Sequence, residues 1–294
     1  MKNHGQPAKV GSFRVGSSRW KDQVDFMLSR VPSIYLSIEL RREWINWDKR
    51  VYLALIRPGD VVIDVGANVG SHTVIFSHLV GSSGRVLAFE PIPATFENLR
   101  QNVQQRGRFE NVTAIQKALG ATRTSTRTMQ IPGDELTQAA LVAHDAEAWA
   151  RAGEVTSVQV TASTLDAEVE RLNLARVDFI KIDVEGAELE VLQGGGTTIA
   201  RFQPLLYCEI YERWAKSFGY SPRDIFSHIA SLGYTGARVF HGSHVTALDI
   251  RGHIPSSAFA ESVDVLFFAA DHSNAITAFD RRLAAATMGT VGAS

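Results

Sequence analysis

The stretch "VVIDVGANVGSHT", residues 61–73, decides the fold of this chain. A short apolar run leads into a glycine-rich turn, and the "SHTVIFSHLV" that follows spaces its apolar residues along one side of a helix. A strand, a tight turn and a helix in this order are how an open sheet presents backbone to a ligand. We therefore expect a ligand site at this turn.

Similar apolar runs recur along the chain, and helix-like stretches separate them. The expected strands are residues 61–65, 85–90, 112–118, 177–183, 204–210 and 263–270. Apolar strands that alternate with helices are typical of a mostly parallel sheet with helices on both faces. The sequence therefore predicts an α/β fold.

The expected organisation is a single domain over residues 20–282 with additions at both ends. Residues 1–19 are polar and rich in Gly and Ser, which predicts a flexible arm, and residues 283–294 predict a C-terminal tail. Residues 20–55 predict an N-terminal helical region. Residues 121–162 depart from this alternation of strands and helices. They contain two stretches in which polar and apolar residues alternate, with a helix-like stretch between them, so we interpret them as an inserted lid that carries substrate contacts.

Charge and composition exclude several classes of partner. The 294 residues carry 30 Lys and Arg against 31 Asp and Glu, so no overall basic field attracts nucleic acid. No stretch reaches the roughly 18 apolar residues of a membrane span, and the N-terminus lacks the apolar part of a secretory signal. The single cysteine, Cys208, excludes an internal disulfide and fits a reducing compartment. We expect a cytoplasmic protein with no nucleic-acid partner.

The turn departs from the common phosphate-binding patterns. Asn68 stands where the dinucleotide fingerprint has its middle glycine, between Gly66 and Gly70, and no P-loop motif is present. Asp64, just before the turn, would repel a pyrophosphate but attract a cationic ligand such as S-adenosylmethionine (SAM). Glu90, at the end of the next strand, is placed to accept hydrogen bonds from ribose hydroxyls. These residues together predict SAM as the cofactor.

The motifs resemble those of the FkbM family of SAM-dependent methyltransferases. The resemblance rests on "VVIDVGANVGSHT", "VLAFEPIPATFENLRQNV", "QKALG" and "VDFIKIDVEGAELEVLQGG", and it covers about residues 55–212 and the last strand near residue 265. It implies the Rossmann-like class I methyltransferase fold, with a seven-stranded, mostly parallel sheet, one antiparallel strand at 263–270 and the insertion after strand three. Family members typically methylate hydroxyl oxygens of sugars, glycolipids or polyketides.

The resemblance also implies which residues bind the cofactor. The residues around the methionine part of SAM would be Asp64, Gly66, Ala67, Asn68 and Gly70. Those around ribose and adenine would be Glu90, Pro91, Ile92, Lys117 and Ala118. The chain departs from the family at His72, where many relatives have an aromatic residue.

Methylation of a hydroxyl requires a base that removes its proton. Asp183, at the end of the fourth strand, is the first candidate, and Glu209, at the end of the fifth, would lie beside it. The pair would serve as base and orienter, or would bind Mg²⁺ if the reaction is metal-dependent. The structural alternative is that Asp183 and Glu185 cap the helix near Ala187 and that Glu209 forms a salt bridge. His144, in the predicted lid, is the alternative base.

Other polar and aromatic residues have two readings each. The side chain of His72 either points at the acceptor or packs in the core. Trp149 and Trp214 either stack on a sugar ring or pack in the core. His241, His244 and His253 lie in a stretch that we interpret as a late loop, without the spacing of a zinc site.

The expected acceptor is a hydroxylated small molecule, first a sugar, glycoside or glycolipid and second a polyketide or macrolide. An NAD-dependent dehydrogenase or epimerase is the main competing class, and the missing middle glycine and Asp64 argue against it. Methylation of nucleic acid or of an amine, and a SAM-binding module without catalysis, rank well behind methylation of oxygen. A homodimer through the N-terminal helical region or the inserted strands is a further expectation.

Overall fold

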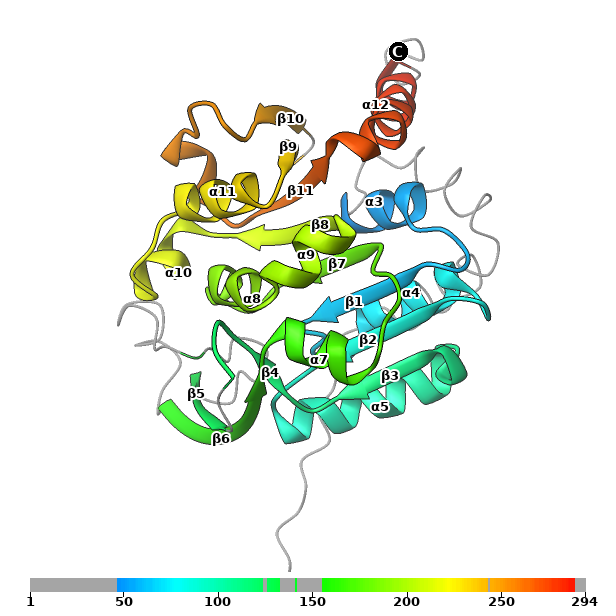
Figure 1. Ribbon diagram of the computed structural model, residues 1–294, viewed down its shortest axis with the longest axis vertical. Helices are drawn as coiled ribbons and strands as arrows, with labels where there is room; N and C mark the ends of the chain where they lie inside the picture. The colour runs from blue at the N-terminus through cyan, green and yellow to red at the C-terminus, as the bar shows by residue number, and fades with distance from the viewer. Residues whose placement is uncertain (1–46, 124–125, 133–140, 142–154, 243, 289–294) are drawn as a thin grey trace, which may run out of the picture.

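The computed structural model describes residues 47–123, 126–132, 141, 155–242 and 244–288 (Figure 1). The predicted arm at residues 1–19, most of the predicted N-terminal helical region, His144 and Trp149 lie outside these residues. Within the described part, no helix is both long and apolar enough to cross a membrane.

An eight-stranded sheet forms the centre of the fold. Its strands, in spatial order, are β10 (His244–Asp249), β9 (Tyr234–His241), β11 (Val263–Ala269), β8 (Leu205–Ile210), β7 (Phe179–Ile182), β1 (Val61–Val65), β2 (Arg85–Phe89) and β3 (Val112–Ile115). The five strands from β8 to β3 are parallel, and β11 is antiparallel to both β8 and β9. The α/β class and the antiparallel last strand are therefore confirmed.

The sheet has eight strands rather than the seven that the resemblance implied, and two of them, β9 and β10, are absent from the strands expected from the sequence. His244 pairs with His241 across a tight turn at Gly242, whose φ is +49°. β10 lies at the edge of the sheet and most of its side chains are exposed, so its alternation is weakly apolar. The placement of His241 and His244 in a loop was wrong for this reason, since they end and begin the two strands of a hairpin.

Helices cover both faces of the sheet (Figure 1). One face packs against α3 (Trp47–Leu55), α4 (Ser71–Val80), α5 (Pro93–Arg106) and α12 (Ser273–Met288). The other packs against α7 (Leu165–Arg171), α8 (Glu188–Gly194), α9 (Gly196–Phe202) and α11 (Pro222–Ser231), with the short α10 (Glu212–Ser217) at the carboxyl end of β8. Short 3₁₀ turns in the described residues include η1 (Phe109–Asn111), η3 (Ser256–Phe259) and η4 (Ala270–His272). α12 extends into the range predicted as a tail.

Strand parity divides the core between the two faces. On β1, Ile63 and Val65 belong to the cluster under α8 and α11, whereas Val62 belongs to the cluster under α3 and α4. Asp64 is on the same side as Val62, so its carboxylate is directed to the α4 face. The alternation thus fixes where each strand-end carboxylate points.

The predicted insertion after strand three forms a second, small sheet. Its strands are β4 (Ala118–Leu119), β6 (Val155–Ser163) and β5 (Thr126–Pro132), with β6 in the middle. β5 and β6 coincide with the two stretches in which polar and apolar residues alternate, in agreement with the predicted inserted β segment. The helix-like part between them lies outside the described residues except for Leu141.

The order of the strands creates the place for a ligand. The chain runs outward through β1, β2 and β3, then returns to the other side of β1 as β7. The helices that follow β1 and β7 therefore lie on opposite faces, and a crevice opens between their turns at the carboxyl ends of the strands.

The close approach of the β1 and β7 turns makes Gly66 sensitive to substitution. Gly66 has a φ of +79°, and a Cβ there would lie 1.8 Å from the carbonyl oxygen of Asp183. We expect Gly66→Ala to lower the free energy of unfolding by about 2 kcal/mol or more, measured by urea denaturation. Gly196→Ala is the matched control, because a Cβ at Gly196 meets no atom within 4 Å. Equal urea midpoints for the two variants would contradict the prediction.

Candidate functional site

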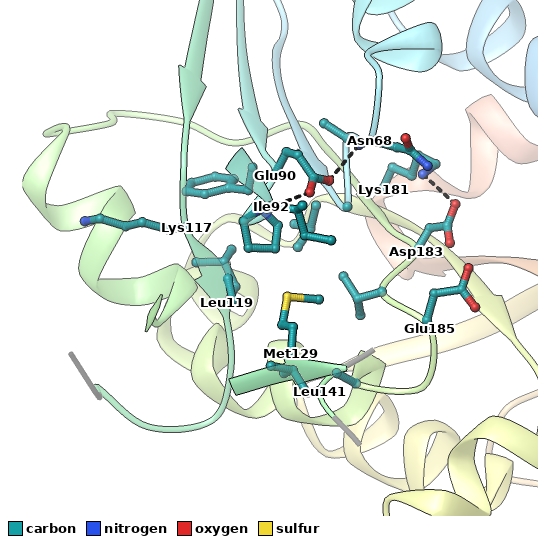
Figure 2. A pocket seen from close by; sticks show the side chains of 18 of the residues that line it. Asn68, Glu90, Ile92, Lys117, Leu119, Met129, Leu141, Lys181, Asp183 and Glu185 are labelled. Carbon is teal, nitrogen blue, oxygen red and sulfur yellow. Dashed lines mark hydrogen bonds and ion pairs between the residues drawn. The ribbon is translucent and has the colours of Figure 1, made fainter. Parts of the chain in front are cut away.

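A pocket of about 220 Å³ lies at the carboxyl ends of β1, β2 and β7. Its lining comes from four parts of the chain: the turn after β1, the end of β2, the β4 segment with the insertion, and the end of β7 (Figure 2). All the predicted cofactor residues except Asp64 and Gly70 line it: Gly66, Ala67, Asn68, Glu90, Pro91, Ile92, Lys117 and Ala118.

The turn after β1 owes its shape to left-handed backbone conformations at Gly66, Asn68 and Gly70. The backbone N–H groups of Gly66 and Ala67 both donate to the carbonyl of Phe89, at 3.1 and 2.9 Å. These bonds fix the turn to the end of β2. Gly70 does not line the pocket, because its α-carbon lies against Leu99 of α5, where a Cβ would come within 2.6 Å.

Glu90 is held in the pocket wall by two backbone donors. Its Oε2 accepts from the N–H of Asn68 at 3.0 Å, and its Oε1 accepts from the N–H of Ile92 at 2.9 Å (Figure 2). The side chain is buried, and burial raises the pKa of Glu90 to about 7 although these two bonds oppose the shift. Each carboxylate oxygen keeps a lone pair for a ligand hydroxyl.

Asp64 is not part of the pocket wall, which corrects its predicted contact with the methionine part of SAM. Its side chain is fully buried on the α4 face, where Oδ2 accepts from the hydroxyl of Thr73 at 2.6 Å. Its Oδ1 lies 3.8 Å from the ammonium of Lys181. Asp64 therefore fastens the first turn of α4 and balances the charge of Lys181, one layer behind the pocket.

The side of the pocket formed by the end of β2, by β4 and by β5 is mostly apolar. Lys117 contributes its aliphatic part only, because its ammonium points away from the pocket and donates to Glu168 at 2.6 Å (Figure 2). Leu119, Met129 and Leu141 complete this wall, and the sequence analysis missed all three. The alternation of residues 126–132 places Met129 on the buried face of β5, a signal that could have found it.

Three carboxyl groups gather at the other end of the pocket. One oxygen from each of Asp183, Glu185 and Glu209 lies within 4.8 Å of the other two. Asp183 Oδ2 accepts from the ammonium of Lys181 at 2.9 Å, and Asp183 also shares a hydrogen bond with Glu209. Glu209 Oε1 accepts from the hydroxyl of Ser262 at 2.5 Å. The structure thus brings Asp183 and Glu209 together, as their strand positions indicated.

The three acids differ in proton affinity. Burial and the charge of Asp183 raise the pKa of Glu209 to about 10, and burial with the charges of Asp183 and Glu188 raises that of Glu185 to about 8. Burial acts in the same direction on Asp183, but Lys181 and the hydrogen bonds outweigh it and lower the pKa. At neutral pH, Asp183 is therefore ionised and Glu209 is the proton donor in their shared hydrogen bond.

This hydrogen-bonding pattern does not favour the conditional Mg²⁺ site at Asp183 and Glu209. Lys181 already supplies the positive charge that balances Asp183, and a protonated Glu209 is a hydrogen-bond donor rather than an oxygen ligand. We derive no chemical step through a metal.

The structure does not show the helix-capping role considered for Asp183 and Glu185. α8 begins at Glu188, and no side chain caps the helix at Ala187. Instead, Glu188 Oε1 accepts from the N–H groups of Val184 and Gly186, at 3.3 and 3.0 Å. The prediction was wrong here because a carboxylate inside the first turn can reach back to the preceding loop, which spacing alone does not reveal.

Asp264 continues the row of acids on the next strand, and the sequence analysis did not single it out. It pairs directly with Glu209 between β11 and β8 and hydrogen-bonds to Asp48 of α3. Asp48 also accepts from the hydroxyl of Tyr207 at 2.6 Å. Burial, then Asp48, raises the pKa of Asp264 to about 8. These contacts fasten the beginning of α3 beside the acid cluster.

His72 lines the pocket and also packs against aromatic side chains. Its ring stands edge-on to Tyr52, with centroids 5.6 Å apart, and burial with the charge of Lys181 lowers its pKa. A neutral ring is therefore expected at physiological pH. The ring of Trp214 lies edge-on to the ring of Tyr211, with their centroids 5.1 Å apart.

The raised carboxyl pKa values predict an unusual dependence of stability on pH. Glu185, Glu209 and Asp264 retain protons in the native state that the unfolded chain releases near pH 4. The free energy of unfolding should therefore fall as pH rises from 7 to 10. Urea denaturation across this range should show a shallower fall for Glu209→Gln than for Glu97→Gln, an exposed control on α5. Parallel curves for the two variants would contradict the assignment.

Comparison with known proteins agrees with this geometry. The protein-family model of the methyltransferase FkbM domain matches residues 64–235, which is more than half of the chain. "Methyltransferase 1" of Beauveria bassiana is 29% identical over 181 residues, which cover 58% of this chain and 72% of that relative.

Two other relatives carry more specific names. The hexuronic acid methyltransferase AglP of Haloferax volcanii is 31% identical over 146 residues, covering 49% of this chain and 54% of that protein. The 31-O-demethyl-FK506 methyltransferase FkbM of Streptomyces tacrolimicus is 53% identical over 47 residues, or 16% of this chain and 18% of that protein. The matches thus span about half of the first and less than a fifth of the second. The extent of the domain match and the cofactor-type pocket together show that this chain belongs to the FkbM family of SAM-dependent methyltransferases.

Proposed function

We propose that this protein transfers the methyl group of SAM to a hydroxyl oxygen of a small molecule, first of all a sugar or glycoside. The observation that carries the proposal is a single pocket with two chemically different ends. One end is apolar with Glu90 at its edge, and the other end is lined by Asp183 and Glu185 (Figure 2).

The cofactor fits this polarity. Adenine would lie against the apolar wall of Ile92, Leu119 and Met129, and the ribose hydroxyls would donate to Glu90. The turn at residues 66–69 would contact the methionine part. The sulfonium would then face the acid end, where negative charge favours a bound cation.

The chemistry at the acid end is a displacement at the methyl carbon. The acceptor oxygen forms the new C–O bond, the C–S bond breaks, and its electron pair leaves the sulfur neutral. The hydroxyl proton passes to a carboxylate of the acid cluster. The pocket must hold the acceptor oxygen, the methyl carbon and the sulfur in one line.

The acceptor class rests on the names of the relatives and on the polar acid end. The hexuronic acid methyltransferase supports a sugar-type acceptor, and the 31-O-demethyl-FK506 methyltransferase supports a macrolide polyketide as the second candidate. Carboxyl groups hydrogen-bond well to the hydroxyls of either class.

The first test is methyl transfer from isotopically labelled SAM to a panel of acceptors. The panel contains methyl glycosides of glucose, galactose, rhamnose and glucuronic acid, with erythromycin as the macrolide. We expect a labelled O-methyl product from at least one glycoside. Binding of S-adenosylhomocysteine without turnover of any member would contradict the proposal and favour a SAM-binding module.

The position of Glu90 predicts how cofactor binding responds to mutation. Glu90→Gln should weaken binding of S-adenosylhomocysteine by about 10-fold or more, because a neutral amide replaces the charged acceptor of the ribose bonds. Glu97→Gln, an exposed change on α5, is the control. Isothermal titration calorimetry measures both affinities, and equal affinities would exclude Glu90 from the ribose site.

The raised pKa of Glu90 predicts a proton released on binding. The free carboxyl has a pKa of about 7, and ribose donors stabilise its charged form, so affinity should increase as pH rises from 6 to 8. Calorimetry at pH 7 in buffers of different ionisation enthalpy should detect the released proton, and Glu90→Gln should abolish it. An equal proton release by that variant would assign the effect to another group.

A further inference from the structure

Glu185 has a backbone conformation that its residue type does not favour. Its φ is +53°, in the left-handed region, and Gly186 follows with a φ of +101°. Residues with a side chain adopt this region rarely, and strained residues of this kind cluster at active sites and ligand-binding sites. The surrounding structure must therefore hold the loop in place.

Buried side chains beneath the loop provide that support. Glu188 accepts from the N–H groups of Val184 and Gly186, and the hydroxyl of Tyr220 donates to the carbonyl of Gly186 at 2.6 Å. The ring of Phe218 closes the other side, since a Cβ at Gly186 would lie 2.8 Å from it. The loop is thus fixed on both sides of Glu185, and Glu185 itself lines the pocket.

A count of hydrogen bonds separates Glu185 from the two neighbouring acids. Asp183 is engaged by Lys181 and Glu209, and Glu209 is engaged by Asp183 and Ser262. No donor in the described parts of the chain bonds to the carboxylate of Glu185, and its Oε2 is buried. A buried carboxyl group in this state requires a hydrogen-bond partner from elsewhere, and a ligand hydroxyl in the pocket would supply it.

We propose that Glu185 is the catalytic base that accepts the proton of the acceptor hydroxyl. The inference rests on the proposed O-methylation and assigns its proton-transfer step. As the acceptor oxygen bonds to the methyl carbon, its proton moves to the Glu185 carboxylate and the C–S electron pair moves to sulfur. Asp183 and Glu209, joined by their hydrogen bond and anchored by Lys181, act as positioning residues.

The proton affinities agree with this division of roles. A base acts best when its pKa is near the working pH, and that of Glu185 is about 8 because of burial and the nearby Asp183 and Glu188. Asp183 has a lowered pKa and is the weaker base, and Glu209, with a pKa of about 10, holds its proton more tightly than Glu185 does.

The test compares Glu185→Gln with Asp183→Asn and with Glu170→Gln, an exposed control on α7. The assay follows methyl transfer to the same panel of glycosides and erythromycin, and calorimetry follows S-adenosylhomocysteine. We expect Glu185→Gln to lower kcat at least 100-fold with cofactor affinity within twofold of wild type. Asp183→Asn should lose less turnover. Loss of turnover in Asp183→Asn while Glu185→Gln stays active would overturn the proposal and make Asp183 the base.

A second readout needs no acceptor and separates this proposal from the proposed function. If the strained conformation is kept for catalysis, Glu185→Gly should raise the melting temperature, because glycine adopts positive φ freely and removes the buried carboxyl group. Asn173→Gly, at another non-glycine residue with a φ of +49°, controls for strain relief alone. A lower melting temperature for Glu185→Gly would reveal a structural role and overturn the proposal. A failure of the wild-type protein to methylate any acceptor would count against the proposed function.

Discussion

The ammonium of Lys181, buried between the carboxylates of Asp64 and Asp183, is the interaction on which the geometry of the site depends. It joins the two strands at which the sheet reverses its order, and Asp64 extends the link to α4 through Thr73. Removing one partner of a buried ion pair costs about 3–5 kcal/mol, because the remaining charge is left without compensation. The positions of the turn after β1 and of the acid cluster are therefore coupled through one charge.

The sheet was predictable to a large extent, because its strands are short apolar runs and its turns carry distinctive glycines. The limits of β1 follow directly from the sequence, and the antiparallel direction of β11 was implied by the family resemblance. β9 and β10 were both missed. β10 is an edge strand whose side chains are mostly exposed, and the apolar residues of β9 are interrupted by Gly236 and Arg238 although the strand is largely buried.

The site was less predictable, for two physical reasons. Asp64 was assigned to the ligand by its proximity to the turn, whereas its side chain is fully buried and accepts a hydrogen bond from Thr73. The acids at the ends of β7 and β8 were correctly expected to meet. Their protonation states depend on burial and on Lys181, however, and neither is contained in the spacing of carboxylates along the chain.

The inserted segment has a consequence for how acceptor specificity can change in this enzyme. Met129 and Leu141 of the insertion form part of the wall against which we place adenine, so the segment expected to select the acceptor also shapes the cofactor site. A substitution or segment exchange that adapts this insertion to a new acceptor would alter the affinity for SAM as well. Evolution or engineering of a new acceptor specificity would then require compensating changes in the adenine wall. Acceptor specificity and SAM affinity would therefore change together.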